Sequence, residues 1–318
     1  MPDGSSPFPI YRQLGVDVVQ MQLVWDRVAP TRPTDPRNPA DPAYRWPLNV
    51  DQAVRDGRRS GIQVALLVRG APSWANGGRE PQWVPGAEQE FANFLTAASR
   101  RYRSVRRWMI WGEPNQQTRF HPLPVGSPVG PRAYALLLDA AYGALKRQNR
   151  RNIVVGGMSF SFGEVRPANW LRWMQLPNGR PPRLDEYGIN PFTGRAPDIS
   201  LQGYPGFPGA RDISDLDILA REVRRTYRSI GRRPRLWVSE FTVSSDRPDR
   251  AFHFAVSRAE QARWLRAAFG ISRRVGAAGF GWFNLMDEPA GTPEGLTTGL
   301  MTYEGERKPS FYAYRRLP

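Results

Sequence analysis

Short, β-branched apolar runs recur along this chain, separated by longer segments in which apolar residues return every three or four positions. Runs of the first kind are typical of buried strands, and segments of the second kind are typical of amphipathic helices. The pattern predicts strands at Val16–Trp25, Ile62–Gly70, Val105–Trp111, Asn152–Phe160, Asp198–Pro205, Arg235–Phe241 and Ala278–Leu285. It predicts helices at 87–102, 131–148, 214–231 and 259–276.

Strands that alternate with helices and are apolar nearly throughout indicate a parallel sheet covered on both faces. Such a sheet is either open and doubly wound or closed into a barrel. A length of 318 residues without a compositional shift that would mark a linker favours the barrel. We therefore expect an α/β chain forming a single (β/α)8 TIM barrel domain over residues 1–318. The proline-rich segment Pro30–Pro47 is predicted to be a loop over the barrel mouth.

The charge, the absence of cysteine and the length of the apolar runs exclude several classes of function. The net charge of +16 points at first to nucleic acid, but the positive charge is almost all arginine scattered over many segments, so no nucleic-acid partner is expected. The chain has no cysteine, which excludes disulfides and thiolate metal sites. No apolar run approaches the ~20 residues of a membrane span. Localisation stays open: secreted if an N-terminal leader was removed, otherwise cytoplasmic.

Two predicted strands end in a glutamate. Glu113 follows the apolar "WMIWG", and Glu240 lies within "LWVSEF". The active site of a (β/α)8 barrel lies at the carboxyl ends of its strands, so both acids are expected there. A single acid at a strand end is often only a solvated side chain. Two acids beside aromatic and apolar residues are harder to explain in that way.

A pair of carboxyl groups is what glycosidic bond hydrolysis requires. One acid protonates the leaving oxygen, and the other group, on the opposite side, attacks the anomeric carbon or activates water. Aromatic rings serve the same chemistry because the C–H faces of sugars pack against them. Four tryptophans fall at or just after predicted strand ends, where each is either part of the core or part of a sugar subsite: Trp25, Trp74, Trp111 and Trp282.

Three motifs then resemble a known group of enzymes. "IWGEPN", "WVSEF" and the closing "GFGWFNLMDEP…GLMTYEGERKPSFYAY" are similar in order and spacing to the clan A glycoside hydrolases, and within them to family 39 or cellulase-like members. The resemblance covers most of the chain and implies a retaining (β/α)8 glycosidase that needs no cofactor. In that clan the acid/base ends the fourth strand and the nucleophile the seventh. Carried over, Glu113 is the acid/base, Glu240 the nucleophile and Trp282 the platform under the sugar.

The sequence departs from the clan's pattern at the acid/base and on the sixth strand. Gly112 stands where the clan usually has an asparagine that binds the sugar 2-hydroxyl, and Asn115 is the candidate to replace that contact. The segment "QGYP" keeps Tyr204 of the usual His-Pro-Tyr but has Gly203 in place of the histidine.

A third departure concerns the nucleophile. The arginine that the clan carries near it on the second strand is Gln20 or Gln22 here, and Arg69 at the end of the next strand is the candidate substitute. These differences suit a furanose or another unusual sugar. They also suit a barrel that has lost its activity.

Other groups are weaker candidates. His121, in the loop after the acid/base, is expected to line the cleft or to be a satisfied loop histidine. The two histidines show no H-E-x-x-H spacing, so no catalytic metal is expected. Asp287, Glu288 and Glu294 follow the last predicted strand, where acids either bind sugar hydroxyls or face water.

The strand count has a consequence for the N-terminus. If Glu113 ends the fourth strand, then Val16–Trp25 is the second, and the first strand is short or missing. Either Met1 to Phe8 supplies a stub before the helical "FPIYRQLG", or the natural chain begins earlier.

The function that these observations favour is a retaining glycoside hydrolase acting on an oligo- or polysaccharide, with a carbohydrate as its only expected partner. Two alternatives stay open: a catalytically inactive carbohydrate-binding barrel, and a basic protein that binds acidic polysaccharide or nucleic acid. The choice between exo and endo action depends on three loops: Pro30–Pro47, Ala71–Pro85 and Tyr187–Pro197.

Overall fold

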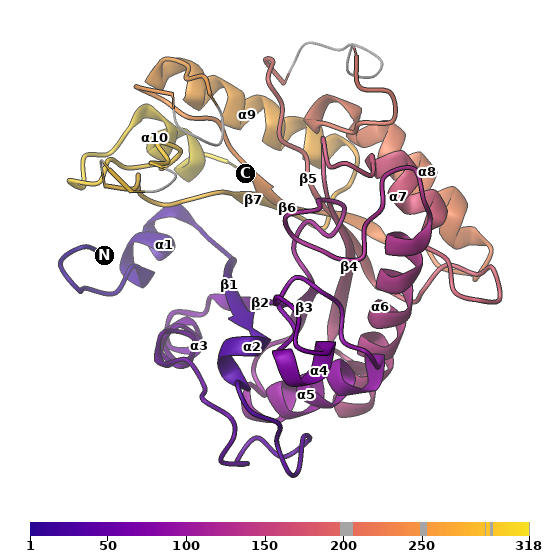
Figure 1. Cartoon of the computed structure of the whole chain (residues 1–318). Coiled ribbons are helices and arrows are strands. Elements are labelled where there is room, and N and C mark those ends of the chain that lie inside the picture. The colour runs from indigo at the N-terminus through magenta and orange to yellow at the C-terminus, as the bar shows by residue number, and fades with distance from the viewer. Residues whose placement is uncertain (198–205, 249–252, 290, 293–294, 318) are drawn as a thin grey trace.

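The strands of the protein form one parallel sheet in chain order (Figure 1). The computed structural model describes residues 1–197, 206–248, 253–289, 291–292 and 295–317. Within them the strands are β1 (Val18–Val24), β2 (Gln63–Arg69), β3 (Arg107–Ile110), β4 (Ile153–Phe160), β5 (Glu186–Asn190), β6 (Arg235–Phe241) and β7 (Gly279–Trp282).

Six of these strands lie where the apolar runs predict them, and β5 does not. The segment "EYGIN" is short and bounded by prolines, and Glu186, Gly188 and Asn190 interrupt its apolar residues. It pairs in parallel with β4 on one side and with β6 on the other, so tertiary pairing stabilises a strand with little local preference. The predicted strand at Asp198–Pro205 lies outside the described residues.

The helices pack outside the sheet (Figure 1). Four of the longer ones, α5, α6, α8 and α9, overlap the four predicted helices, whereas α3, which is as long as α8, was not predicted. Ser257 caps α9 through a capping box with Glu260. None of the described helices is long and apolar enough to cross a membrane. The helices are α1 (Phe8–Leu14), α2 (Trp25–Val28), α3 (Leu48–Ser60), α4 (Ser73–Asn76), α5 (Glu88–Arg101), α6 (Val129–Gln148), α7 (Pro167–Trp173), η1 (Ile213–Asp215), α8 (Leu216–Arg228), α9 (Arg258–Arg274) and α10 (Pro309–Arg315).

Side chains alternate between the two faces of the sheet, and each face has its own apolar cluster. Inward residues such as Leu67, Met109 and Trp237 form a compact group inside the curled sheet. Outward residues such as Leu66 and Trp108 pack against the helices in the main core. Because inward positions recur every second residue, the inward series on β1 and β2 continues into polar side chains at the carboxyl ends of the strands.

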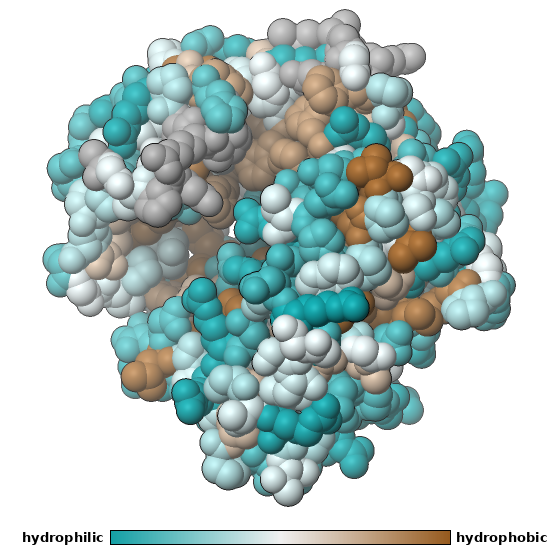
Figure 2. Space-filling view, in the orientation of Figure 1, coloured by the Kyte–Doolittle hydropathy of each residue, from teal (hydrophilic) through white to brown (hydrophobic). Residues whose placement is uncertain are grey.

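Within the described residues, the sheet does not close into the expected eight-stranded barrel. Among the described residues β1 and β7 are the two edges and do not pair with each other. Met1 to Phe8 supply no strand, since they form a turn that leads into α1. On this open side Leu14 of α1 packs with Leu265 and Phe311. The space-filling view shows an opening there, with hydrophobic residues in its depth (Figure 2).

The segment Pro30–Pro47 is a loop, as predicted, but it does not cover the barrel mouth. It runs along the outside of α5, where Trp46 stacks on Phe94 at 6.1 Å between ring centroids and meets Tyr102 edge-on. Arg100, near the carboxyl end of α5, donates to the carbonyl of Arg37 at 2.9 Å. Trp46, an aromatic residue of this proline-rich segment, therefore anchors the loop to α5.

Candidate active site

The turn after β3 places Glu113 at the carboxyl end of the sheet. Trp111 and Glu113 have positive φ angles of 60° and 51°, a conformation that is uncommon outside glycine and that often marks a functional site. The Glu113 amide donates to the carbonyl of Met158 on β4 at 3.0 Å. Between them, a Cβ atom at Gly112 would lie 3.2 Å from Cδ2 of Leu67. The asparagine that the clan usually has at this position would therefore require Leu67 to shift.

The carboxyl group of Glu113 accepts from two amide side chains and lies near a guanidinium. Asn190 Nδ2 donates to Oε1 at 2.9 Å, and Gln116 Nε2 donates to Oε2 at 2.5 Å. Arg119 Nε lies 3.9 Å from Oε2. The side chain is only 16% exposed. Donors and a nearby cation favour the ionised form of a carboxyl group, so this environment suits a carboxylate.

Glu240, near the end of β6, has a contrasting environment. One donor is described for it, Gln20 Nε2, at 3.1 Å from Oε1. Burial and then the negative charge of Glu113 raise the pKa of Glu240 to about 8, while Gln20 and Arg119 act in the opposite direction. The two carboxyl groups therefore interact electrostatically. At neutral pH the arrangement favours one proton on the pair, held by Glu240.

Asn190 links Glu113 to Ser239, the residue before Glu240, and was not predicted from the sequence. It ends β5, one residue beyond the pairing of Ile189 with Val238 on β6. While its Nδ2 donates to Glu113, its Oδ1 accepts from the hydroxyl of Ser239, the residue before Glu240. The amide is therefore held at both ends. The only sequence signal was a polar residue that ends a short apolar run before a proline, "GINP".

The two glutamines of β1 have different partners. Gln20 contacts Glu240, whereas Gln22 Oε1 accepts from Arg69 Nε at 2.9 Å. Burial, together with the positive charge of Arg119, lowers the pKa of Arg69. Among the described contacts, the neighbour that replaces the clan's arginine beside Glu240 is therefore Gln20, while Arg69 adds positive charge at the mouth.

Two of the four tryptophans are buried and two are half-buried. Trp25 and Trp111 are each 1% exposed, so neither ring has a face on which a sugar could stack, which corrects the subsite interpretation for both. Trp74 is half-buried edge-on against Trp25, and its Nε1 donates to the carbonyl of Ala29. Trp282 on β7 is also half-buried, meets Phe241 of β6 edge-on and donates to the carbonyl of Thr298. Trp282 thus stays a candidate platform.

Asn115 has a structural role instead of the predicted sugar contact. It is fully buried, and its Nδ2 donates to the carbonyls of Phe160 and Val165 at 2.8 and 3.0 Å. Its Oδ1 accepts from the amide of Phe160 at 2.7 Å. With these bonds it ties the loop after β4 to the turn that carries Glu113. No group of the Asn115 side chain is left to bind a sugar.

Two further predicted positions have different outcomes. His121 is half-buried and stacks on Trp83 at 4.9 Å between ring centroids, so it lies in a loop against an aromatic ring. Tyr204 lies outside the described residues. Among those residues, no group of three or more potential ligands could hold a metal ion.

The acids after the last strand are partly structural. Asp287 pairs with Lys308 at 2.6 Å, and Lys308, which is fully buried, also donates to Ser245. This pair explains the lysine of the closing "KPSF", since a buried ammonium group needs a carboxylate partner. Glu288 accepts from the amide of Leu296 at 3.1 Å, and Glu294 lies outside the described residues.

Solved structures with a similar arrangement are glycoside hydrolases. A family 39 enzyme from the gut symbiont Bacteroides cellulosilyticus WH2 matches with a TM-score of 0.69 and 21% identity, over 97% of this chain and 59% of that chain. A GH39 enzyme from Xanthomonas axonopodis pv. citri matches with a TM-score of 0.66 and 18% identity, over 97% of this chain and 61% of that chain. A monomeric β-xylosidase from Caulobacter crescentus CB15 matches with a TM-score of 0.63 and 18% identity, over 97% of this chain and 62% of that chain. The chain has the fold of family 39 glycoside hydrolases.

This likeness confirms the resemblance to family 39 that the sequence motifs indicate, and it supports the predicted α/β architecture with a parallel sheet. The chain spans about three fifths of the length of these structures. No protein-family profile matches the sequence, and no curated protein sequence does. The activity therefore has to be argued from the site itself.

Proposed function

We propose that this protein is a retaining glycoside hydrolase that cleaves a glycosidic bond in an oligo- or polysaccharide. The observation that carries the proposal is the pair of carboxyl groups of Glu113, in the turn after β3, and Glu240, near the end of β6. They lie at the carboxyl end of a sheet with the fold of family 39 enzymes, and the negative charge of Glu113 raises the pKa of Glu240. Hydrolysis of a glycosidic bond requires two carboxyl groups that share one proton, one acting as an acid and the other as a carboxylate. Similar structures described as a β-xylosidase and a glucosidase support a carbohydrate substrate.

In the proposed mechanism a carboxylate oxygen of Glu240 attacks the anomeric carbon. The bond from that carbon to the bridging oxygen breaks, and Glu113 gives its proton to the departing oxygen. In the second step Glu113, now a carboxylate, takes a proton from water. The water oxygen bonds to the anomeric carbon, and Glu240 leaves as a carboxylate. Two inversions at the same carbon retain its configuration.

The first step needs the proton on Glu113, whereas the free protein favours it on Glu240. We propose that substrate binding reverses this preference. Positive charge develops at the sugar ring next to Glu240 as the bond breaks, and a nearby positive charge favours the ionised form of a carboxyl group. The bridging oxygen beside Glu113 in turn offers the protonated form an acceptor. Asn190 and Gln116 then hold the carboxylate that Glu113 becomes.

The stereochemistry of the product tests the proposed reaction. Aryl β-xyloside and β-glucoside substrates are hydrolysed in deuterated buffer, and the anomeric proton of the released sugar is followed by NMR before mutarotation. We expect the β-anomer to appear first. Initial release of the α-anomer would contradict double displacement. Binding of oligosaccharides without turnover of any aryl glycoside would instead support the inactive carbohydrate-binding barrel.

Asn190→Ala is expected to lower kcat/KM by about 10- to 100-fold, the value of one hydrogen bond to a charged group. The variant loses the donor that favours the carboxylate form of Glu113, so the acidic limb of the pH–activity profile should move to higher pH. KM should change little because Asn190 acts through Glu113. Ser239→Ala, which frees the other end of the amide, should give a smaller change of the same kind. An unchanged pH profile in Asn190→Ala would contradict this positioning role.

A further inference from the structure

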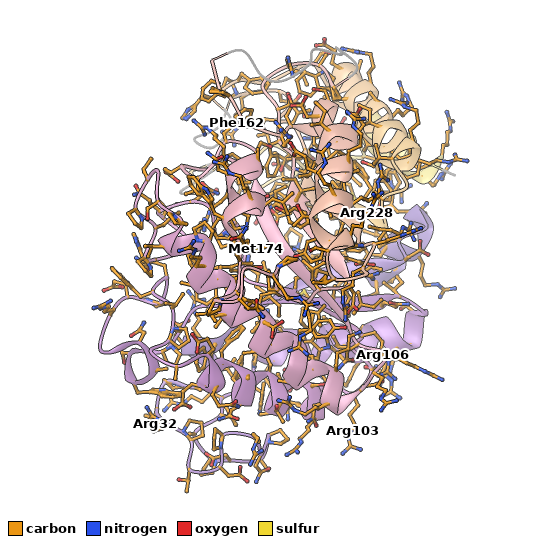
Figure 3. All side chains as sticks on the ribbon, turned by 90° about the vertical axis from the view of Figure 1, so that its right-hand side faces the viewer. Arg32, Arg103, Arg106, Phe162, Met174 and Arg228 are labelled. Carbon is orange, nitrogen blue, oxygen red and sulfur yellow. The ribbon has the colours of Figure 1, made fainter. Side chains whose placement is uncertain are left out.

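Arginines gather at the end of the sheet opposite the glutamate pair. Arg106 immediately precedes β3, and Arg233 lies two residues before β6. The strands are parallel, so these residues lie at the amino ends of the strands that carry the acids at their carboxyl ends. A seven-residue strand such as β6 spans roughly 20 Å. Arg228, Arg106 and Arg103 lie along the same side of the molecule (Figure 3).

We propose that this end of the protein is a docking surface for an acidic polysaccharide, distinct from the catalytic cleft. The surface, called here the arginine face, consists of Arg103, Arg106, Arg224, Arg228 and Arg233. Four of these side chains are exposed and Arg106 is half-buried. No described carboxylate pairs with any of them. The choice of an acidic polysaccharide as the ligand rests on the proposed carbohydrate function. The expectation that the arginine face binds an anion does not rest on it.

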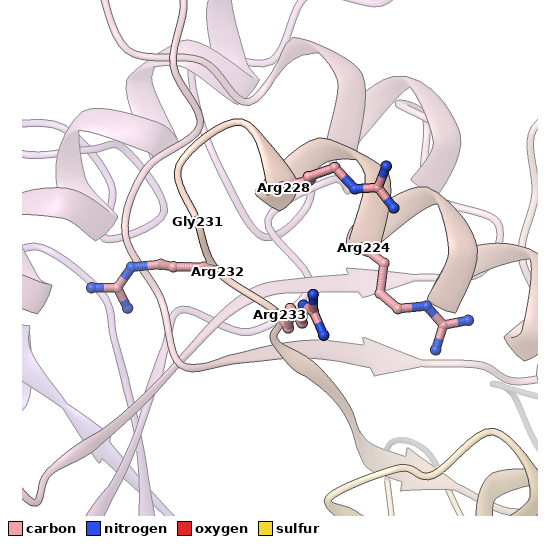
Figure 4. A pocket seen from close by; sticks show the side chains of 5 residues that line it. All are labelled: Arg224, Arg228, Gly231, Arg232 and Arg233. Atoms are coloured by element: carbon pink, nitrogen blue, oxygen red, sulfur yellow. The ribbon is translucent and has the colours of Figure 1, made fainter.

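The first part of the arginine face is a hollow of about 370 Å³ between the end of α8 and the start of β6. Four arginines and Gly231 line it, and no acidic residue does. Arg224, Arg228 and Arg233 extend to the same side, whereas Arg232 points away (Figure 4). Arg232 is occupied elsewhere: it donates to the carbonyl of Leu184 at 3.0 Å and lies over the ring of Tyr142. Three guanidinium groups thus remain available to an anion.

The second part is a hollow of about 650 Å³ at the carboxyl ends of α5 and α6. Its lining combines Arg103 and Arg106 with uncharged hydrogen-bonding side chains, among them Gln148 and Asn149, and it contains no acid. Among the described contacts, Arg103 donates to the carbonyl of Arg100 alone, at 3.3 Å. Asp185 forms ion pairs with Lys146 and with Arg232. The two hollows are lined by separate sets of residues, so a ligand that occupies both must be a polymer with spaced charges.

Helix stabilisation does not account for this concentration of charge. Cations in the last turn of a helix interact favourably with its dipole, which explains Arg228. The effect fades within one turn. Arg103, Arg106 and Arg233 lie beyond the ends of α5 and α8, so they gain little from it. Unpaired arginines that repel one another lower the free energy of unfolding unless an anion binds them.

The composition of both hollows favours a polysaccharide over a nucleic acid or a membrane. Neither lining contains an aromatic ring on which a base could stack, and neither contains a large apolar side chain that could enter a lipid layer. The planar guanidinium fork binds carboxylates through two hydrogen bonds. Arg69 and Arg119 add positive charge at the proposed catalytic cleft, so a polymer with acidic sugars matches both ends of the molecule.

The test is binding of polygalacturonate to the intact protein at low salt. Arg228→Glu/Arg233→Glu and Arg103→Glu/Arg106→Glu alter the two hollows. The control Arg12→Glu/Arg316→Glu changes two exposed arginines in and next to α1 and α10. Each double substitution lowers the net charge by four, from +16 to +12.

We expect the Kd for polygalacturonate to rise at least about 10-fold in the first two variants and less than about 3-fold in the control. Binding by the wild type should weaken about 10-fold or more between 50 and 200 mM salt.

Three results would overturn the proposal: no polygalacturonate binding by the wild type, an equal loss in the control, and tighter binding of duplex DNA than of polygalacturonate with the same losses in both hollows. Hydrolysis of a small aryl glycoside should stay unchanged in all variants. Failure of docking is therefore separate from failure of the proposed activity. Thermal unfolding of each variant verifies that it is folded.

Discussion

With Glu240 replaced by alanine, we expect kcat/KM for an aryl glycoside to fall by at least about 10³-fold, because no covalent intermediate can form. Glu113→Ala should lower it by about 10²- to 10⁴-fold for substrates whose leaving group needs a proton, and much less for an activated dinitrophenyl leaving group. The difference arises because, in the proposed mechanism, Glu240 attacks the anomeric carbon, whereas Glu113 protonates the leaving oxygen. Steady-state kinetics with leaving groups of graded pKa measures it.

Azide distinguishes the two roles chemically. In Glu240→Ala the small anion enters the vacated space and attacks the anomeric carbon, so the glycosyl azide should have inverted configuration. In Glu113→Ala azide should intercept the intermediate on Glu240, so the product should have retained configuration. The opposite pair of outcomes would exchange the roles of the two glutamates. Glu164, an exposed acid after β4, is the control, and Glu164→Ala should change kcat/KM by less than about threefold.

The second large effect concerns stability. We expect Glu240→Gln to raise the free energy of unfolding at pH 9 by roughly 2–5 kcal/mol, measured by urea titration, and to leave it nearly unchanged at pH 4. The pKa of Glu240 is raised from 4.5 to about 8 in the folded protein. Stability from its bound proton is therefore fully present below about pH 4.5 and is lost as the pH rises through about 8. Glutamine cannot ionise, so the variant avoids this loss.

Glu186 provides a matched control with the opposite expectation. It is a buried glutamate that accepts two hydrogen bonds from Arg107, at 2.9 and 3.0 Å. Glu186→Gln removes a paired charge and leaves the guanidinium group buried, so it should lower the free energy of unfolding by about 3 kcal/mol at neutral pH. A Glu240→Gln variant that is no more stable than the wild type at pH 9 would show that ionisation of Glu240 does not destabilise the folded protein.

Local pattern was sufficient for most of the secondary structure. Period and residue type depend on nearest neighbours along the chain, so strands such as β2 and β6 and helices such as α5 and α6 were predicted within a few residues. The same reasoning failed for β5, whose short segment becomes a strand only by pairing with β4 and β6. It also could not show that, among the described residues, β1 and β7 do not pair with each other, because closure depends on residues far apart in sequence.

The chemistry divided in a similar way. The sequence alone determined that two glutamates end strands three positions apart in a parallel sheet, and parallel strands bring such ends to one edge. Only the tertiary structure decided which neighbours set their protonation: Gln20 and Asn190 from other strands, and Arg119 from a loop. It also decided that Trp25, Trp111 and Asn115 are buried. Periodicity reports the direction of a side chain within its own element, whereas its surroundings depend on the register and packing of segments distant in the chain.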